Sequence, residues 1–209
     1  MAFAVAGAVA LAVAGETTAL GSTVVVLSVE RRQSLARLVR EAGYERREEP
    51  FRLSSGATSH DYGDIRRAVA SGPALRTVAE ALLDGVDLDW EVIGGPTMGA
   101  DPLAHAAALL ASKAWLSVRK EPKGHGRGQW IEGRVPGVGD RVLAVEDTVS
   151  TGRSLLGAIE RIAGTGAVVV GATAVLDRSP AVAARFSAAG ITWRPLLNWE
   201  DLGIEPLSE

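Results

Sequence analysis

The stretch that most constrains this chain is Val142–Ser154, which reads VLAVEDTVSTGRS. Its first residues, Val142–Val145, form an apolar run typical of a parallel strand that is buried on both faces. An acidic pair and a turn rich in hydroxyl groups follow, and Leu155, Ile159 and Ile162 continue at helical spacing. The turn is therefore predicted to join the carboxyl end of a strand to the amino end of a helix, which is where α/β sheets bind ligands.

The chemistry of this turn suits a phosphate group. Unpaired backbone N–H groups at the start of a helix, together with Thr and Ser hydroxyls, form a positively polarised concavity. The acidic pair, Glu146 and Asp147, indicates a second ligand group, because carboxylates beside a phosphate repel it unless they bind ribose hydroxyls or the water shell of a magnesium ion. For an acidic pair considered alone, a plain helix cap is the alternative.

A second glycine-rich turn, Gly94–Gly99, separates a predicted strand at Trp90–Ile93 from a predicted helix at Pro102–Ala111. Neither GxGxxG nor GxxxxGK[ST] occurs in the chain, so both nucleotide-binding fingerprints are absent. The turn is either a plain connection or a further ligand loop.

A basic stretch at 119–129, RKEPKGHGRGQ, follows a predicted strand at Ala114–Val118. Glycine at alternate positions disfavours both a helix and a packed strand, so a mobile loop is predicted. Its Lys, Arg and His side chains suit a transient pyrophosphate ligand. A solvated hairpin tip with incidental charges is the alternative.

The remaining pattern alternates strands with helices, which predicts an α/β fold with a mostly parallel sheet flanked by helices. An amphipathic helix ends at Gly43, and another follows Pro73. The other predicted segments are extended Pro50–Leu53, a turn at Ser54–Gly56, strand Asp61–Ile65, strand Ala167–Leu176, helix Ala181–Ala189 and strand Ile191–Leu197.

Composition limits the possible classes of protein. A length of 209 residues suits one domain, assigned here to residues 30–209. The net charge of −3 gives no reason to expect nucleic-acid binding, and the lack of cysteine excludes disulfides and cysteinyl metal sites while permitting a reducing cytoplasm. In the apolar segment 1–29, the run Ala2–Gly15 lacks the charged n-region of a signal peptide and is too short to span a membrane, so the segment is expected to precede the domain.

The run Val145–Gly152 resembles the phosphoribosyl pyrophosphate signature of type I phosphoribosyltransferases. The resemblance implies that family's fold, with a small N-terminal hood region. It also implies that Glu146 and Asp147 hold the ribose hydroxyls, with Asp147 counted among the catalytic residues. The residues implied to bind the 5′-phosphate are Thr148, Val149, Ser150, Thr151, Gly152 and Arg153, and those implied to meet the pyrophosphate are Gly95, Thr97 and Gly99.

The basic stretch is similar to the catalytic loop of orotate phosphoribosyltransferases. This resemblance implies that Arg119, Lys120, Lys123 and His125 bind the pyrophosphate, and that loop 119–129 reaches the site of the partner subunit in a homodimer. It further implies that Arg178, after a predicted strand, binds the carboxylate of the base and that Tyr62 contacts the substrate. The Asp-Arg pair and its fork-shaped guanidinium suit such a carboxylate.

The sequence departs from the family pattern in the region expected to recognise the base. Ser54 and Met98 stand where many members carry Lys, and Tyr62 is the one aromatic residue where the family usually has two in succession. A carboxylate at Asp61 would disfavour an anionic base unless it points away.

The implied reaction transfers phosphoribosyl from phosphoribosyl pyrophosphate to orotate. The implied cofactor is magnesium held by the substrate, with no direct protein ligand and with water linking it to Glu146 and Asp147. The implied enzyme is cytoplasmic and binds neither nucleic acid nor membrane. The alternatives are transfer to another nucleobase and a non-catalytic protein that senses phosphoribosyl pyrophosphate.

Overall fold

The computed structural model describes residues 27–52, 56, 58–122 and 129–207. The predictions for segment 1–26, for Ser54, and for Lys123 and His125 therefore lie outside the described residues. In the part of the chain that is described, no helix is both long enough and apolar enough to cross a membrane.

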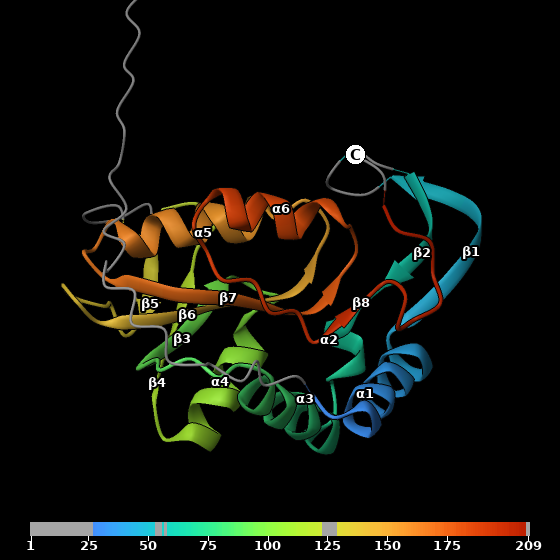
Figure 1. Cartoon of the computed structure of the whole chain (residues 1–209), viewed down its shortest axis with the longest axis horizontal. Coiled ribbons are helices and arrows are strands. Elements are labelled where there is room, and N and C mark those ends of the chain that lie inside the picture. Colours follow the sequence, from blue (N-terminus) through green and yellow to red (C-terminus); the bar gives the residue numbers. More distant parts are fainter. Residues whose placement is uncertain (1–26, 53–55, 57, 123–128, 208–209) are drawn as a thin grey trace, which may run out of the picture.

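A six-stranded sheet forms the centre of the structure, in the order β5-β4-β3-β6-β7-β8 (Figure 1). Neighbouring strands from β4 to β8 run parallel, and β5 pairs antiparallel with β4, which confirms the predicted α/β class. The strands are β3 (Val92–Pro96), β4 (Ala114–Val118), β5 (Ile131–Gly133), β6 (Arg141–Val149), β7 (Val168–Asp177) and β8 (Leu197–Asn198). Because β3 and β6 are parallel neighbours, their carboxyl ends meet at one edge of the sheet.

Helices cover both faces of this sheet (Figure 1). On one face lie α1 (Val29–Ala42), α3 (Gly72–Gly85) and α4 (Asp101–Ala111), and on the other α5 (Arg153–Ala163) and α6 (Ala181–Ala188). Each helix turns an apolar stripe toward the sheet, as its sequence spacing predicts. The largest fully buried side chains of the helices are Leu35, Leu82, Leu103, Leu155, Ile162 and Phe186.

A small antiparallel sheet stands beside the central one and forms the part that we call the hood, β1 (Tyr44–Arg52) and β2 (Thr58–Gly63) (Figure 1). The pairing of β1 with β2 shifts register between Arg46 and Phe51. Pro50, which has no N–H to donate, lies inside this interval and is tolerated there because the strand is at an edge. The short helix α2 (Ile65–Ala68) leads from the hood back to the main sheet.

Two predicted strands differ from the structure. The strand predicted at Asp61–Ile65 ends at Gly63, because the Asp64 side chain accepts a hydrogen bond from the Arg67 amide and caps α2. The strand predicted at Ile191–Leu197 is reduced to β8 and one isolated bridge. Pro195 lies between these two pairings, and the Arg194 and Leu196 amides on either side of it donate to the Ala172 and Ala174 carbonyls of β7 at 3.0 and 2.9 Å.

Two predicted boundaries near the site also move. Gly94 and Gly95 belong to β3 rather than to a turn, so the connection to α4 is shorter than predicted. The sequence pattern placed the end of the following strand, β6, at the acidic pair. In the structure, β6 continues through Glu146 and Asp147 to Val149. The pairing of Glu146 with Ala174 and of Thr148 with Leu176 carries this extension.

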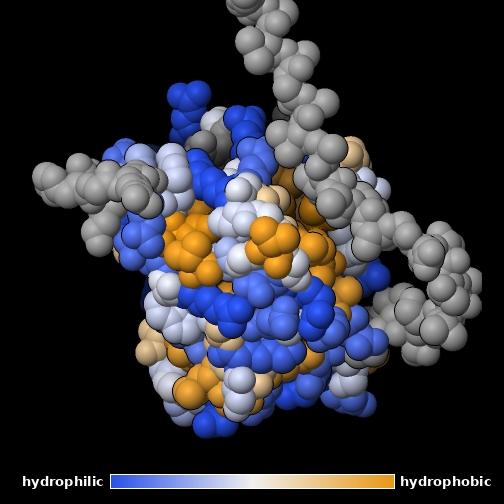
Figure 2. Space-filling view, turned by 90° about the vertical axis from the view of Figure 1, so that its left-hand side faces the viewer, coloured by the Kyte–Doolittle hydropathy of each residue, from blue (hydrophilic) through white to orange (hydrophobic). Residues whose placement is uncertain are grey.

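The side of the molecule away from the hood carries hydrophobic residues among polar ones (Figure 2). Among the described residues, the exposed large hydrophobic side chains include Leu109, Val135 and Val138, and Val138 has 91% of its surface exposed. Single exposed side chains of this kind are common in soluble domains and carry no functional conclusion here.

Candidate active site

Two adjoining cavities lie at the carboxyl ends of β3, β4 and β6, and the larger has a volume of about 740 Å³. Its lining brings together residues from all three predicted motifs. The predicted site residues in this lining are Thr97, Gly99, Arg119, Lys120, Glu146, Asp147 and Thr148. The lining residues that were not predicted as site residues are Arg66, which lies outside the three motifs, and Pro96, Met98, Glu121 and Ser154, which lie within them.

The two carboxylates of β6 are close together and shielded from water. Glu146 has only 7% of its surface exposed. Burial, and then the negative charge of Asp147, raise the pKa of Glu146 to about 8, although the Asp147 amide and the Ser154 hydroxyl oppose this. Burial also raises the pKa of Asp147, while its hydrogen bond from the Thr148 amide at 2.6 Å and the positive charge of Arg66 oppose the shift. Such a pair is suited to groups that supply hydrogen-bond donors or positive charge.

The smaller cavity, of about 230 Å³, lies in the turn between β6 and α5. Its lining includes all the residues predicted for the 5′-phosphate, namely Thr148, Val149, Ser150, Thr151, Gly152 and Arg153. The Thr148 hydroxyl is buried and has no hydrogen-bond partner within the described structure, so it is free to bind a ligand oxygen. Gly152 precedes α5 with φ of +77°, and a Cβ there would lie 2.7 Å from the Phe186 ring, so only glycine suits the turn.

The turn between β3 and α4 is held by one carboxylate. Asp101, the first residue of α4, accepts a hydrogen bond from the Thr97 hydroxyl at 2.7 Å and another from the Ser117 hydroxyl at 2.6 Å. The Thr97 amide also donates to the Val118 carbonyl at 2.9 Å. These bonds fix the turn to the end of β4, where the basic stretch begins. An Asp in the first turn of a helix after a glycine-rich connection was the only sequence signal for this role.

Glycines let this turn approach β6 closely. Gly95 lies in β3 below the cavity, and a Cβ there would come within 1.8 Å of the Val145 carbonyl oxygen. Gly99 lines the cavity, and a Cβ there would lie 2.6 Å from the Asp147 carboxyl group. Both predicted glycines thus serve the contact between two strand ends, and Gly99 borders directly on a predicted ribose ligand.

The first residues of the basic stretch reach the larger cavity from β4. Arg119 pairs with Glu132 at 3.2 Å, and its Nε donates to the Glu121 carbonyl at 3.2 Å. Lys120 lines the same cavity. The predicted partners Lys123 and His125 lie outside the described residues.

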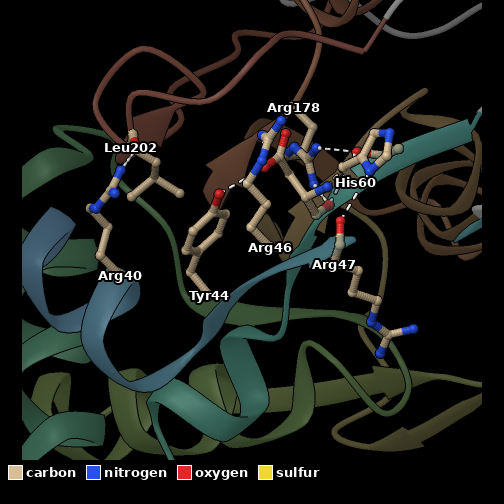
Figure 3. Close-up of polar contacts among 9 residues, drawn as sticks. Arg40, Tyr44, Arg46, Arg47, His60, Arg178 and Leu202 are labelled. Atoms are coloured by element: carbon tan, nitrogen blue, oxygen red, sulfur yellow. Dashed lines mark hydrogen bonds and ion pairs between the residues drawn. The ribbon is translucent and has the colours of Figure 1, made fainter. Parts of the chain in front are cut away.

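Arg178 lies at the boundary between the main sheet and the hood, outside the lining of both cavities (Figure 3). It has 2% of its surface exposed, and its guanidinium donates to the Asp61 carbonyl at 3.1 Å and to the Ser59 hydroxyl at 3.4 Å. Burial lowers the pKa of Arg178. Its Nε is buried without a partner in the described structure, which leaves one donor of the fork for a ligand.

The Asp61 carboxylate is neutralised inside the hood. It accepts hydrogen bonds from the Tyr44 hydroxyl at 2.7 Å and from Arg46 at 3.0 Å (Figure 3). The sequence suggested that the negative charge of Asp61 would repel an anionic base. In the structure this charge is paired with Arg46. Proximity of Asp61 raises the pKa of Arg46, so this partner stays charged.

Tyr62 packs inside the hood and does not line either cavity. Its ring meets the Phe51 ring edge-on, with centroids 5.4 Å apart. Arg47 lies 4.9 Å from the centroids of both rings. An aromatic pair thus exists in the hood, but its two members come from different strands, which the local sequence could not reveal.

Magnesium fits these groups only in part. Among the described residues, no cluster of three or more His, Cys, Asp or Glu side chains could hold a metal ion. The adjacent Glu146 and Asp147 carboxylates are hard oxygen ligands, and burial raises the pKa of each, which a bound cation would oppose. They fit a cation that obtains its other ligands from water and from a bound phosphate compound.

The sequence and the fold were compared with known proteins. No protein-family model matches the chain. The orotate phosphoribosyltransferase of Methanothermobacter thermautotrophicus is 40% identical over 172 residues, which cover 82% of this chain and 94% of that protein. The orotate phosphoribosyltransferase of Streptomyces avermitilis is 42% identical over 161 residues, which cover 73% of this chain and 87% of that protein.

Solved structures agree with these relatives. The crystal structure of Mycobacterium tuberculosis orotate phosphoribosyltransferase in complex with 5-phospho-α-D-ribosyl 1-diphosphate (PRPP) is similar with a TM-score of 0.67 and 35% identity, over 83% of this chain and 99% of that one. The identity and the coverage of the curated relatives, with the type I phosphoribosyltransferase fold, confirm the family that the sequence motifs indicated. The chain belongs to the orotate phosphoribosyltransferase family.

Proposed function

We propose that the protein transfers the phosphoribosyl group of PRPP to orotate and forms orotidine 5′-monophosphate and pyrophosphate. The observation that carries this proposal is the larger cavity, in which the Glu146 and Asp147 carboxylates and the cations Arg119 and Lys120 line one space. A ribose with hydroxyls at one end and a pyrophosphate at the other matches this distribution of charge. The family relationship supports the same reaction.

The reaction breaks the bond between the anomeric carbon and the pyrophosphate oxygen and forms a bond from that carbon to a ring nitrogen of orotate, whose proton passes to the departing pyrophosphate or to water. Positive charge develops on the ribose, and negative charge develops on the departing pyrophosphate. In this proposal Glu146 and Asp147, which line the cavity, bind the ribose hydroxyls near the positive charge. Arg119 and Lys120, with Lys123 and His125 in our proposal, stabilise the pyrophosphate through positioned positive charges.

The phosphate end of PRPP would occupy the smaller cavity. There the unpartnered Thr148 hydroxyl and the amides at the start of α5 provide donors, and Gly152 allows the backbone to come close. At the other end, Arg178 and the hood would hold the base. The free Nε of Arg178 suits a carboxylate oxygen, while its other donors keep it attached to β2.

Magnesium is the cofactor in this proposal. Bound with PRPP, it neutralises pyrophosphate charge and makes that group a better leaving group. Glu146 and Asp147 would hold its water ligands, and no protein atom coordinates it directly.

The proposal includes a cytoplasmic homodimer in which loop 119–129 reaches the partner's site. The resemblance of the basic stretch to the family's catalytic loop supports this, and the lack of cysteine is compatible with a reducing compartment. Sedimentation of the purified protein tests the dimer. Mixing a Lys123→Ala protein with an Asp147→Asn protein tests the shared site, because Lys123 is proposed to act in the partner's site and a mixed dimer would then recover one intact site and part of the activity.

The direct test incubates purified protein with magnesium and PRPP, adds orotate, uracil, hypoxanthine or adenine in turn, and follows pyrophosphate release. We expect release that depends on orotate. Release with a purine and not with orotate would contradict the substrate, and would mean that Arg178 serves the hood alone. No release with any base, together with tight binding of PRPP, would indicate a sensor rather than an enzyme.

A further inference from the structure

Arg66 is a cation of the larger cavity that no sequence motif identified. It is the second residue of α2 and lines the same space as Arg119 and Lys120. Those two residues begin the basic stretch after β4, whereas Arg66 belongs to α2, which contacts β6. Its side chain is 48% exposed, and its Nε lies 3.6 Å from the Asp64 carboxylate, a distance too long for a strong hydrogen bond.

The backbone that carries Arg66 is firmly placed. Ile65 and Ala68 are buried with 1% and 3% of their surface exposed. The Asp64 side chain caps α2 from one side, and the Asp64 amide donates to the Gly43 carbonyl at 2.7 Å. Arg66 therefore starts from a fixed position at the cavity wall, although its guanidinium retains freedom to turn toward a ligand.

Arg66 acts on the part of the cavity where the two strand ends meet. Its positive charge opposes the rise in the pKa of Asp147, so the two side chains are close enough to interact. The Asp147 carboxyl group lies against Gly99, and Thr97 lines the same space. The cation is thus placed at the turn between β3 and α4, away from the 5′-phosphate turn, whose lining does not include it.

The charge balance of the cavity leaves this cation available. The described anions of the lining are Glu121, Glu146 and Asp147, and burial favours the protonated form of both β6 carboxylates. Arg119 is already paired with Glu132. Among the described residues, Arg66 makes a long contact to Asp64 and interacts with Asp147, and a more highly charged phosphate ligand could replace both.

We propose that Arg66 binds the pyrophosphate group of the donor, as a second source of positive charge beside the basic stretch. This inference rests on the proposed function. The planar guanidinium can donate two parallel hydrogen bonds to one phosphate, which a lysine cannot do. If Arg66 served only to offset the charges of Asp64 and Asp147, its loss would change the stability of the protein and leave pyrophosphate affinity unchanged.

The test compares Arg66→Gln with Arg67→Gln in the full-length protein. Arg67 is the next residue, is exposed, and does not line either cavity, so it is a matched control for removal of one charge from α2. Binding of pyrophosphate with magnesium is measured by calorimetry, and the KM values for PRPP and for orotate are measured separately. We expect Arg66→Gln to weaken pyrophosphate binding and raise the KM for PRPP by about tenfold to a hundredfold, the effect of one charge-assisted contact.

Further outcomes decide the matter. The KM for orotate should stay within about twofold of wild type, and Arg66→Lys should recover only part of the lost affinity. Equal pyrophosphate affinity in the Arg66→Gln and Arg67→Gln proteins would overturn the inference, as would a rise confined to the KM for orotate. If wild-type protein binds pyrophosphate but does not turn over orotate, the proposed function fails, while the calorimetry still decides the role of Arg66.

Discussion

In the proposed function, the donor end of the site, which would hold PRPP, and the base end, which would hold orotate, are built from different kinds of sequence. At the donor end, Glu146, Asp147 and the phosphate turn follow one another along a single strand and its connection to α5. At the base end, Arg178 meets β2 across a separation of more than a hundred residues, as in its bond to the Asp61 carbonyl. A contiguous group of ligands keeps its spacing through local backbone geometry, whereas a dispersed group depends on the packing of the hood.

This difference predicts separate responses to substitution. Donor-end changes should alter the handling of PRPP with little cost in stability, since those side chains face a cavity. Base-end changes should cost stability as well as orotate affinity, because the same side chains attach the hood to the main sheet.

The largest effect is expected for Asp147→Asn. The amide keeps the shape of the side chain but removes the charge beside the developing positive ribose, so kcat/KM should fall about 10²- to 10³-fold. The melting temperature should not fall, because a buried negative charge next to Glu146 is lost. Steady-state kinetics and thermal unfolding measure both. An Asp89→Asn protein is the control, since that side chain is 77% exposed and lies outside both cavities. An Asp147→Asn protein that keeps more than a tenth of wild-type activity would contradict the role given to the donor end.

A second effect appears as a pH dependence of stability. The folded protein holds a proton on Glu146 up to a pKa of about 8, whereas the unfolded chain releases it near 4.5. The free energy of unfolding should therefore fall as the pH rises between these values. Glu146→Gln removes this loss, so at pH 9 without ligand the variant should be more stable than wild type by about 2 to 4 kcal/mol, and less active.

Urea unfolding from pH 5 to 9 measures this difference. The raised pKa of Asp147 acts in the same direction, so a shallower slope should remain in the Glu146→Gln protein. Parallel curves of unfolding free energy against pH for the two proteins would show that burial of the Glu146 carboxylate does not lower stability. The contrast between a donor end that costs stability at high pH and the hood would then be lost.

At the base end, the Arg178→Lys substitution keeps the positive charge but removes the planar guanidinium, which can donate two parallel hydrogen bonds. We expect the KM for orotate to rise about tenfold and the KM for PRPP to stay nearly constant. The bonds to Asp61 and Ser59 weaken at the same time, which should cost about 1 to 2 kcal/mol of stability. Ser59→Ala is the matched control, because it removes one hood bond and leaves Arg178 in place. A rise in the KM for PRPP instead would mean that Arg178 belongs to the donor end.

The smallest effect is expected for Asp101→Asn. Asn has a single acceptor oxygen, so it cannot receive both the Thr97 and the Ser117 hydroxyls as Asp101 does. The turn between β3 and α4 should loosen, and the KM for PRPP should rise about fivefold to tenfold with kcat less affected. Ser117→Ala removes only the bond to β4 and should change the KM by about twofold; identical values for both variants would show that the Thr97 bond has no role in binding.

The sequence predicted what is local and missed what is distant. The alternation of strands and helices, and the strand–turn–helix unit around the acidic pair, followed from periodicity and from contiguous motifs. The strand predicted at Ile191–Leu197 formed only in part: the Arg194 and Leu196 amides donate to β7, but regular strand pairing is limited to Leu197–Asn198, which an apolar run does not show. Of β1, only the part from Pro50 was predicted; residues 44–49 were missed because they are mostly charged and exposed, and only pairing with β2 makes them a strand.

The same limit explains the site residues that were missed. Asp101 and Arg66 are ordinary first-turn residues of helices when read alone. Their importance comes from neighbours in space, Thr97 and Ser117 in one case and Asp147 in the other. The aromatic partner of Tyr62 was likewise sought beside it in the chain, although Phe51 supplies it from the adjacent strand.

The contact between Gly99 and Asp147 has a consequence for how this enzyme can change. A methyl group at position 99 would occupy the space of the Asp147 carboxyl group, so the two positions share one volume. We expect them to covary among relatives, with glycine kept wherever the acid is kept. A directed-evolution library that randomises position 99 alone should return glycine, and new donor specificities should arise only from libraries that vary both positions together.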